Sequence, residues 1–232
     1  MPSKTQARAP ARNKVIAKGD FWTVRAAGRP QAAEVLIYGD IGESWWGESV
    51  SAKDLVQQLN EIDATEIDVR INSYGGSVAD GVSIYNALRR HPAIVHVTVD
   101  GVAVSIASLI AMAGDSVQMG IGSLYMVHAP WAGAVGNAND MRTAADMLDK
   151  YAEAMVSAYT RRLGEDRADD VRDWLTDGAD HWFTAAEAVA EGFADEATDT
   201  TELPAAASGS AAFQALFTRF DLPAAAAASL KE

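Results

Sequence analysis

The sequence contains no cysteine, which excludes disulfide bonds, thiolate catalysis and cysteine-ligated metal sites. Basic residues are also scarce: 19 Lys and Arg stand against 32 Asp and Glu, a formal net charge of −13. A protein that binds the nucleic-acid backbone needs a basic surface, so we expect no nucleic-acid partner. No apolar run reaches the 18 or more residues typical of a membrane span, and the longest, Gly101 to Gly114, contains two serines. These absences predict a cytoplasmic protein without membrane contact.

What the sequence does contain is ordinary globular composition, with 49% hydrophobic and 22% charged residues over 232 positions. That length predicts one domain with tails. Residues 1–20 are polar, basic and aperiodic and are predicted to be disordered. Residues 21–197 form the predicted domain. Residues 198–232 are a low-complexity extension in which four apolar side chains with helical spacing predict a short amphipathic helix: Phe213, Leu216, Phe217 and Phe220.

Strand and helix patterns alternate within the predicted domain. Strands are expected at 34–38, 67–71, 94–99, 116–119 and 124–127, and helices at 51–62, 77–90, 104–113, 139–163 and 167–175, with a last short helix capped by Thr184. A tight turn is expected at Asp100-Gly101, after the third strand. This order predicts an α/β fold built from βαβ units with a mostly parallel sheet.

Ser105 is the first candidate for chemistry, because it opens the buried helix that follows the third strand. Free backbone N–H groups at a helix start stabilise negative charge, which an acyl-transfer nucleophile needs. The Gly-x-Ser-x-Gly motif of a nucleophile elbow is absent, so a simple helix cap stays open as an alternative. Ser108, one turn deeper, is expected to hydrogen-bond to a helical carbonyl.

Two further segments could contribute to a site. His128 ends the apolar strand 124–127, and ligands bind at the carboxyl ends of such strands; a structural histidine is the alternative. Gly75-Gly76 lies between a strand and a helix, where glycines allow close approach of backbone to a ligand. An amide there could bind an oxyanion, or the pair could be an ordinary turn. Asp177 and Asp180 are both candidate acids near the last helix.

Four segments together resemble the ClpP family of serine peptidases. They are INSYGGSVADGVSIYNAL (71–88), GVAVSIASLIAMAG (101–114), LYMVHAP (124–130) and DHWFTAAEAVAEGFAD (180–195). The resemblance runs from about residue 34 to 197 and implies a ClpP/crotonase-like stacked βαβ spiral with a projecting long helix.

The resemblance also implies the roles of residues. Ser105 takes the position of the nucleophile, His128 of the base and Asp180 of the acid, with the N–H groups of Gly76 and Ile106 as the oxyanion hole. Four residues are expected to bind the substrate: Gly75, Gly76, Ala129 and Pro130. No metal or cofactor is required, and a homo-oligomeric ring is expected, with the long helix after residue 138 joining rings.

Several short sequence segments resemble more closely one branch of this family, the ClpP-related head maturation proteases of phages and prophages. They are the early Phe21-Trp22, IYGDIG (37–42), SLIAMAGD (108–115) and the run Trp182 to Ala185. This branch implies a capsid or scaffold protein as substrate, in a bacterial host cell or a phage prohead. Two departures stand out: Tyr74 replaces the family's proline, and the N-terminal segment does not resemble the axial loop that meets an ATPase. Coupling to an ATPase unfoldase is therefore not predicted.

Three other functions stay open on the sequence. A crotonase-like acyl-CoA enzyme would also use glycine-flanked amides, but it would need no Ser105–His128 pair. A non-catalytic capsid-assembly component could keep the fold, although it would have no reason to retain all three candidate triad residues. A Ser–Lys signal-peptide peptidase fits less well, because no lysine lies between Lys53 and Lys150.

Overall fold

The computed structural model describes residues 15–18, 22–27, 29, 31–42 and 52–198. Within these residues nine strands form one sheet: β1 (Val15–Lys18), β2 (Trp22–Ala26), β3 (Ala32–Tyr38), β4 (Glu66–Ser73), β5 (Ile94–Val104), β6 (Ser116–Gly120), β7 (Leu124–His128), β8 (Asp180–Thr184) and β9 (Glu196–Thr198). The helices of the same part are α1 (Ala52–Glu61), α2 (Val78–Arg90), α3 (Ile106–Ala111), α4 (Ala138–Leu163), the 3₁₀ turn η1 (Glu165–Arg167), α5 (Ala168–Trp174) and α6 (Ala185–Ala190).

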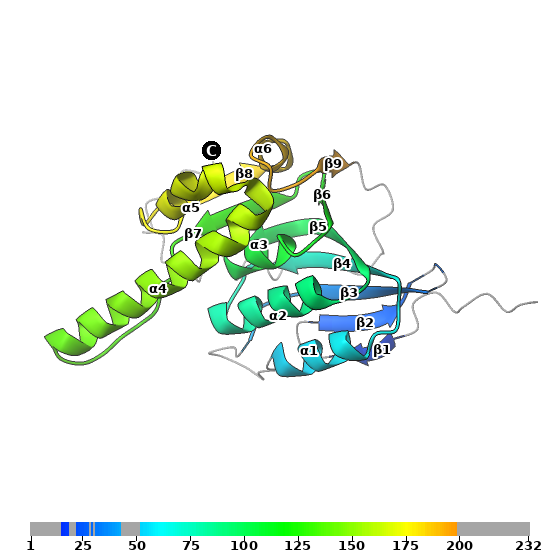
Figure 1. Ribbon diagram of the computed structural model, residues 1–232, viewed down its shortest axis with the longest axis horizontal. Helices are drawn as coiled ribbons and strands as arrows, with labels where there is room; N and C mark the ends of the chain where they lie inside the picture. Colours follow the sequence, from blue (N-terminus) through cyan, green and yellow to red (C-terminus); the bar gives the residue numbers. More distant parts are fainter. Residues whose placement is uncertain (1–14, 19–21, 28, 30, 43–51, 199–232) are drawn as a thin grey trace, which may run out of the picture. The chain divides into compact units, whose positions relative to one another are not determined.

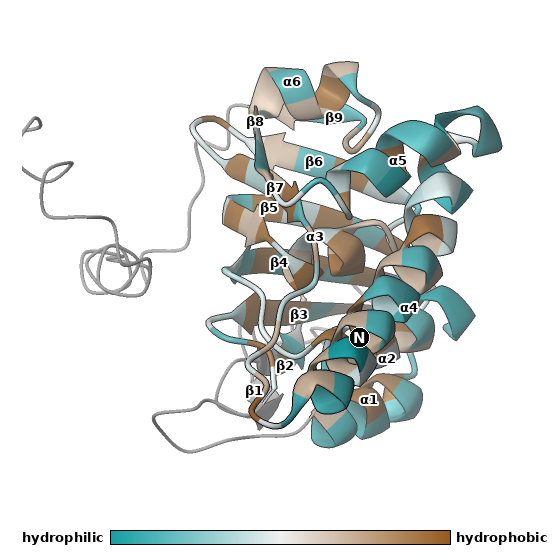
Figure 2. Cartoon of the chain, turned by 90° about the vertical axis from the view of Figure 1, so that its left-hand side faces the viewer, coloured by the Kyte–Doolittle hydropathy of each residue, from teal (hydrophilic) through white to brown (hydrophobic). Residues whose placement is uncertain are grey.

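The sheet is mostly parallel, which confirms the predicted fold class. Parallel pairs join β3 to β4, β4 to β5, β5 to β6 and β6 to β9, while β1–β2 and β2–β3 are antiparallel. β5 also pairs in parallel with β7, which pairs antiparallel with β8, so the sheet branches at β5. Parallel strands need long crossovers, and the helices of those crossovers cover one face of the sheet (Figures 1 and 2).

The core lies between the sheet and this helical layer. Alternate residues of β3 and β4 are buried and the residues between them are half-buried, the period-2 pattern of strands with one apolar face. All six residues of α3 are buried, as its apolar sequence predicts, and Figure 2 shows hydrophobic colour on the strands and on α3 but mostly polar colour on α5. Burial of this apolar surface holds the layers together.

Helix ends follow their capping residues. Ser77 caps α2 by accepting a hydrogen bond from the Asp80 N–H, and acidic and basic residues in the first and last turns complement the helix dipole. α2 ends before His91-Pro92, as expected. Thr184 and Glu187 form a capping box at α6, also as expected. The expected cap at Ser51 lies outside the described residues.

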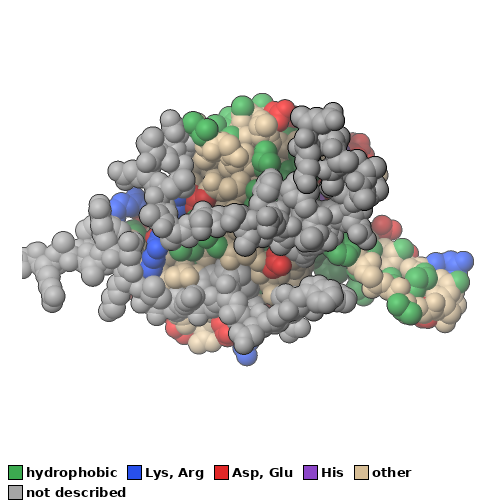
Figure 3. All heavy atoms as spheres, turned by 180° about the vertical axis from the view of Figure 1, so that it is seen from behind, with side chains coloured by type: hydrophobic (Ala, Val, Ile, Leu, Met, Phe, Trp, Pro, Cys, Tyr) green, Lys and Arg blue, Asp and Glu red, His purple; other side chains and the backbone are tan. Residues whose placement is uncertain are grey.

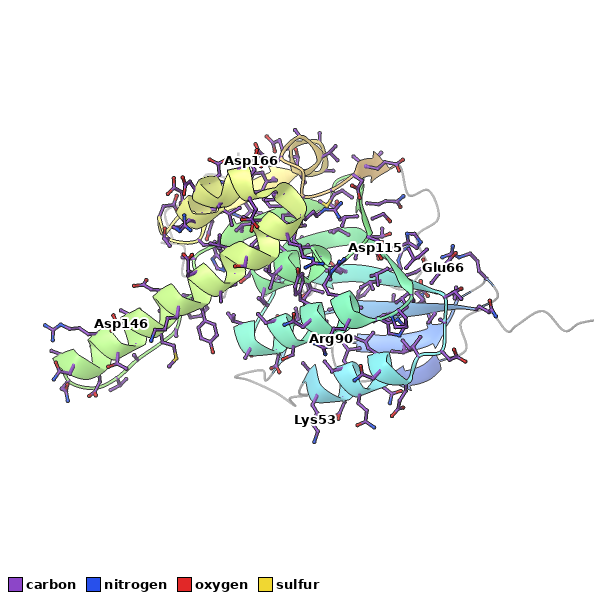
Figure 4. The ribbon with its side chains drawn as sticks, in the orientation of Figure 1. Lys53, Glu66, Arg90, Asp115, Asp146 and Asp166 are labelled. Carbon is purple, nitrogen blue, oxygen red and sulfur yellow. The ribbon has the colours of Figure 1, made fainter. Side chains whose placement is uncertain are left out.

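The long helix α4 has two different halves. Its second half packs on the body through Ala152, Met155, Val156 and Tyr159. Its first half, where Asp146 is labelled in Figure 4, extends beyond the sheet and exposes Met147, 55% of whose surface is accessible. The view from behind shows hydrophobic side chains on this projecting part (Figure 3).

The structure corrects three expectations. Val15–Lys18 forms strand β1, although residues 1–20 were expected to be disordered; pairing with β2 explains the order that the local sequence does not show. β5 does not end at residue 99, because it passes straight through the expected Asp100-Gly101 turn. β8 and β9 were not expected, since each is short and depends on a partner distant in sequence. The predicted C-terminal amphipathic helix lies outside the described residues.

Candidate active site

The continuation of β5 past residue 99 is what places Ser105. β5 pairs with β6 through residues 96–99 and then with β7 through residues 102–104, so it changes partner near Gly101. The side chain of Asn72 occupies the space that a Cβ at Gly101 would need, and its Oδ1 accepts a hydrogen bond from the Val102 N–H. Ser105 follows at the carboxyl end of β5, immediately before α3. This is the sheet edge opposite Glu66 and Asp115, which mark the amino ends of β4 and β6 in Figure 4.

Ser105 has a strained backbone. Its φ of 56° and ψ of −129° lie in a region that non-glycine residues rarely adopt and that costs on the order of 1–3 kcal/mol. The Ser105 N–H donates to the Met126 carbonyl on β7 at 3.0 Å, which holds this conformation. Its hydroxyl makes no helix-cap hydrogen bond. The strained strand-to-helix turn therefore leaves the hydroxyl available to another side chain, as in a nucleophile elbow, although the Gly-x-Ser-x-Gly motif is absent.

His128 is the last residue of β7, the strand beside the end of β5. Its Nε2 lies 2.8 Å from Ser105 Oγ, and its side chain is 12% exposed. The sequence separation of the two residues is 23, so the parallel β5–β7 pairing brings them together. The contact is short enough for the hydroxyl to donate its proton to the imidazole.

Asp180 opens β8 and stands directly opposite His128 in the antiparallel β7–β8 pairing. Its Oδ1 lies 3.1 Å from His128 Nδ1, and 45% of its side chain is exposed. A neutral imidazole between these partners donates from Nδ1 to the carboxylate and accepts from the Ser105 hydroxyl at Nε2. The structure thus brings the three predicted triad residues into one hydrogen-bonded row.

The other candidate acid, Asp177, has different partners. Its carboxylate accepts hydrogen bonds from the Ala179 N–H at 2.9 Å and from His181 Nε2 at 3.0 Å. The Ala179 amide first, and then His181, hold the pKa of the Asp177 carboxyl below its usual value. Asp177 therefore fixes the turn before β8, while Asp180 reaches His128.

Ser108, the other serine of this helix, is fully buried. Its Oγ donates to the Ser105 carbonyl, as the sequence predicts, and it also contacts the Tyr159 hydroxyl at 2.6 Å. Burial raises the pKa of Tyr159 above its ordinary range, so this phenol stays neutral. The Ser108 hydroxyl is thus hydrogen-bonded within a buried cluster with Tyr159 and the Ser105 carbonyl, and in the described structure it has no hydrogen bond to His128.

Gly75 and Gly76 lie beside Ser105 and have φ values of +93° and +145°. A Cβ at Gly75 would stand 2.7 Å from Ser105 Cβ, and one at Gly76 would stand 2.1 Å from the Ile41 carbonyl oxygen. Both positions therefore require glycine. Gly76 is exposed, and in the described part of the chain neither its N–H nor that of Ile106 has a hydrogen-bond acceptor. Two amides near the serine are thus unpaired: that of Ile106, the next residue, and that of Gly76, which follows the Gly75 that contacts Ser105.

The remaining site predictions are placed but not tested by the geometry. Ala129 and Pro130 continue the chain directly from His128 and are half-buried, and their expected contact with substrate stays a prediction. Among the described residues no three metal-ligating side chains converge on one point. No helix of that same part is long and apolar enough to cross a membrane.

Ser73 is a residue of this region that sequence reasoning missed. It is fully buried at the end of β4, and its hydroxyl contacts two backbone segments. Within the run Asn72 to Gly76 it is one polar residue of an ordinary turn pattern. The alternation of buried positions along β4 is the one signal that could have singled it out, because Ser73 follows Ile67, Val69 and Ile71 on the buried face.

Comparison with known proteins gives a consistent result. The model of the Clp protease family matches residues 32–201. The chain is similar to the ATP-dependent Clp protease proteolytic subunit of Leuconostoc citreum, with 34% identity over 69% of this chain and 80% of that protein. It is also similar to the proteins of the same name from Bacteroides thetaiotaomicron, with 30% identity over 64% of this chain and 69% of that protein, and Deinococcus radiodurans, with 31% identity over 66% and 77%.

Proposed function

We propose a catalytic mechanism on the premise that the chain belongs to the Clp protease family. The protein is a serine peptidase, as are the proteolytic subunits to which it is similar. In our proposal Ser105 is the nucleophile, His128 the general base and Asp180 the acid that orients the base. The observation that carries this assignment is the row of contacts at 2.8 Å and 3.1 Å from Ser105 through His128 to Asp180.

The reaction would follow the serine-protease template. Ser105 Oγ attacks the carbonyl carbon of the scissile peptide bond while His128 Nε2 accepts the hydroxyl proton. Asp180 stabilises the imidazolium that forms. The tetrahedral intermediate collapses when His128 returns the proton to the leaving amine, and an acyl-enzyme remains. Water, deprotonated by His128, then attacks the ester carbon and releases Ser105.

The N–H groups of Gly76 and Ile106 would bind the negatively charged oxygen of the tetrahedral intermediate. Support comes from the place of Ile106 next to Ser105, from the contact of Gly75 with Ser105, and from the absence of another acceptor for either amide in the described residues. Donors aimed at this oxygen stabilise the transition state more than the substrate, so they accelerate the chemical step. Gly75, Gly76, Ala129 and Pro130 would line the bound peptide.

Labelling with a fluorophosphonate probe, followed by mass spectrometry, tests the nucleophile. The wild-type protein should be labelled at Ser105, and Ser105→Ala should lose both labelling and peptide hydrolysis while it keeps its fold. Ser108→Ala is the matched control and should still be labelled at Ser105. Labelling at Ser108, or no labelling of the wild type, would contradict the proposal. Labelling of the wild type would also exclude a non-catalytic assembly component.

As substrate we propose a capsid or scaffold protein of a phage head. The supporting features are the sequence segments that resemble head maturation proteases, among them SLIAMAGD (108–115) and the run Trp182 to Ala185. The extension 198–232 is a further one, because members of that branch carry an extended C-terminus. Incubation of purified capsid and scaffold proteins with the wild type and with Ser105→Ala, without ATP or an unfoldase, should give cleavage by the wild type alone. Intact capsid and scaffold proteins in both reactions would refute this substrate.

We also propose that the protein forms a homo-oligomeric ring, as members of its family do. The projecting half of α4 exposes Met141 and Met147, which a neighbouring subunit would cover. Sedimentation velocity at micromolar concentration should show a large oligomer. A monomer alone would refute ring assembly.

A further inference from the structure

We propose that Ser73 is a positioning residue that holds the Gly75–Gly76 peptide in the orientation needed for the oxyanion hole. This inference rests on the proposed function, because it says that a side chain outside the triad fixes the direction in which the Gly76 N–H points. Four observations on the segments around Ser73 support it.

The first observation is the burial and bonding of Ser73. No part of its side chain is exposed, and its hydroxyl bridges two backbone segments. Ser73 Oγ donates to the Gly39 carbonyl at 2.5 Å and accepts from the Gly75 N–H at 3.1 Å. Because the buried Ser73 hydroxyl and the buried Gly75 amide must both be paired, these two bonds strongly favour one local arrangement.

The second observation is the segment that follows β3, which runs beside the glycine loop. The Gly39 N–H donates to the Asn72 carbonyl at 3.0 Å, and the Ile41 N–H donates to the Gly75 carbonyl at 2.8 Å. The Ser77 N–H donates to the Ile41 carbonyl at 2.8 Å. Backbone hydrogen bonds therefore hold the Gly75–Gly76 loop along one side, and the Ser73 hydroxyl adds a side-chain hydrogen bond within it.

The third observation concerns the direction of the Gly76 N–H. The Gly75 carbonyl and the Gly76 N–H belong to one planar trans peptide, in which the two groups point in opposite directions. Because the carbonyl points to Ile41, the N–H points away from that segment, and Gly76 is an exposed residue. The Gly75 Cβ position, 2.7 Å from Ser105 Cβ, shows how close the loop comes to the nucleophile.

The fourth observation is the conformational freedom of the loop. Two consecutive glycines with positive φ have access to more backbone conformations than any other pair of residues. Without the Ser73 hydroxyl, the Gly75 N–H loses its acceptor, and rotation of the adjacent peptide planes becomes easier. A rotated Gly75–Gly76 peptide would present a carbonyl oxygen where the oxyanion needs a donor.

The experiment compares Ser73→Ala with Ser123→Ala. Ser123 is also buried and also donates its hydroxyl to a glycine carbonyl, that of Gly120 at 2.7 Å, but it lies at the amino end of β7. Active sites are first counted by complete fluorophosphonate labelling of Ser105, so that only folded enzyme is compared. We expect Ser73→Ala to lower kcat per labelled site by about 10- to 100-fold, less than the 10²- to 10³-fold typical of losing an oxyanion donor outright. Ser123→Ala should change kcat less than twofold.

A second readout separates positioning from general damage. A peptide boronate forms a tetrahedral adduct with the nucleophile and uses the oxyanion hole, whereas the product peptide of the leaving-amine side forms no adduct and has no oxygen at that position. Ser73→Ala should weaken boronate binding by about the same factor as kcat and leave product-peptide binding unchanged, and Ser73→Thr, which keeps a hydroxyl, should recover part of kcat.

Equal weakening of boronate and product binding, or unchanged kcat in Ser73→Ala, would overturn the role of Ser73 while the triad assignment stands. Failure of the wild type to be labelled at Ser105 would instead overturn the proposed function itself.

Discussion

Replacement of Asp180 by asparagine tests the triad most directly, because the size of the loss can be worked out from the structure. In the proposed mechanism His128 carries a positive charge in the transition state, 3.1 Å from the Asp180 carboxylate. Two unit charges at this distance attract by about 1.3 kcal/mol in bulk water and by about 5 kcal/mol at the effective dielectric constant near 20 of a protein surface. At 1.36 kcal/mol for each factor of ten, these limits correspond to about 10-fold and about 10⁴-fold in rate.

The exposure of Asp180 places the expected loss between these limits. With 45% of its side chain exposed, water screens the pair more than in the serine-protease template, where the same change costs about 10⁴ in kcat. We therefore expect Asp180→Asn to lower kcat/KM by about 10²- to 10³-fold. Asparagine also favours the wrong imidazole tautomer, because its amide would donate to His128 Nδ1.

The assay is steady-state hydrolysis of a short fluorogenic peptide, with Asp177→Asn as the matched control. Asp177 contacts Ala179 and His181, and an asparagine there still offers an oxygen to both, so the control should stay within about twofold of the wild type. A loss of less than tenfold in Asp180→Asn, or a larger loss in Asp177→Asn, would refute the assignment of the acid.

Three further outcomes follow from the same structure. Ser108→Ala should lower the free energy of unfolding by about 1–3 kcal/mol, measured by urea denaturation, because it removes a buried hydroxyl from Tyr159 and from a backbone carbonyl. The Thr184 N–H and hydroxyl hold the pKa of Glu187 below its usual value. The stability that Glu187→Ala removes should therefore be fully present above about pH 4.3, the pKa of Glu in an unfolded chain, and vanish as the pH falls through the lower pKa of the folded state. A difference in stability between the two proteins that does not change with pH would contradict this. Deletion of residues 198–232 should leave hydrolysis of a small peptide ester intact and weaken cleavage of the natural substrate; loss of ester hydrolysis would place the extension within the catalytic fold.

Local sequence patterns predicted those elements whose ends depend on nearby residues. The bounds of α2, the capping box of α6 and the span of α4 were all predicted within a residue or so, because caps and helical periodicity act over one or two turns. The burial of α3 followed from its apolar sequence.

Elements that depend on distant partners were missed. β8 is five residues long and exists through its pairing with β7, which lies more than fifty residues earlier in the chain. β5 was expected to end at Asp100-Gly101, a dipeptide typical of turns, yet pairing with β7 carries the strand on to Val104. Tertiary pairing overrode local propensity in both cases.

The candidate site shows the same division. Ser105 and His128 were singled out by their places at the ends of predicted elements, and the resemblance to a family chose Asp180 over Asp177. The geometry that joins them, a strained serine and a cross-strand pair, required the three-dimensional structure. Sequence reasoning missed Ser73, because its two bonds to backbone segments leave no mark in the sequence and only the alternation of buried positions along β4 could have singled it out.

The proposed triad depends on the register of the pairing between β8 and β7. Side chains alternate between the two faces of a strand, so a slip of one residue would place Ala179 or His181 opposite His128 and turn Asp180 to the other side. Gain or loss of a residue in the connection 175–179 that shifted this register would disconnect the proposed acid from the proposed base, while all three side chains remained in the sequence. The register of β8 against β7 is therefore as decisive for the proposed triad as the identity of its acid.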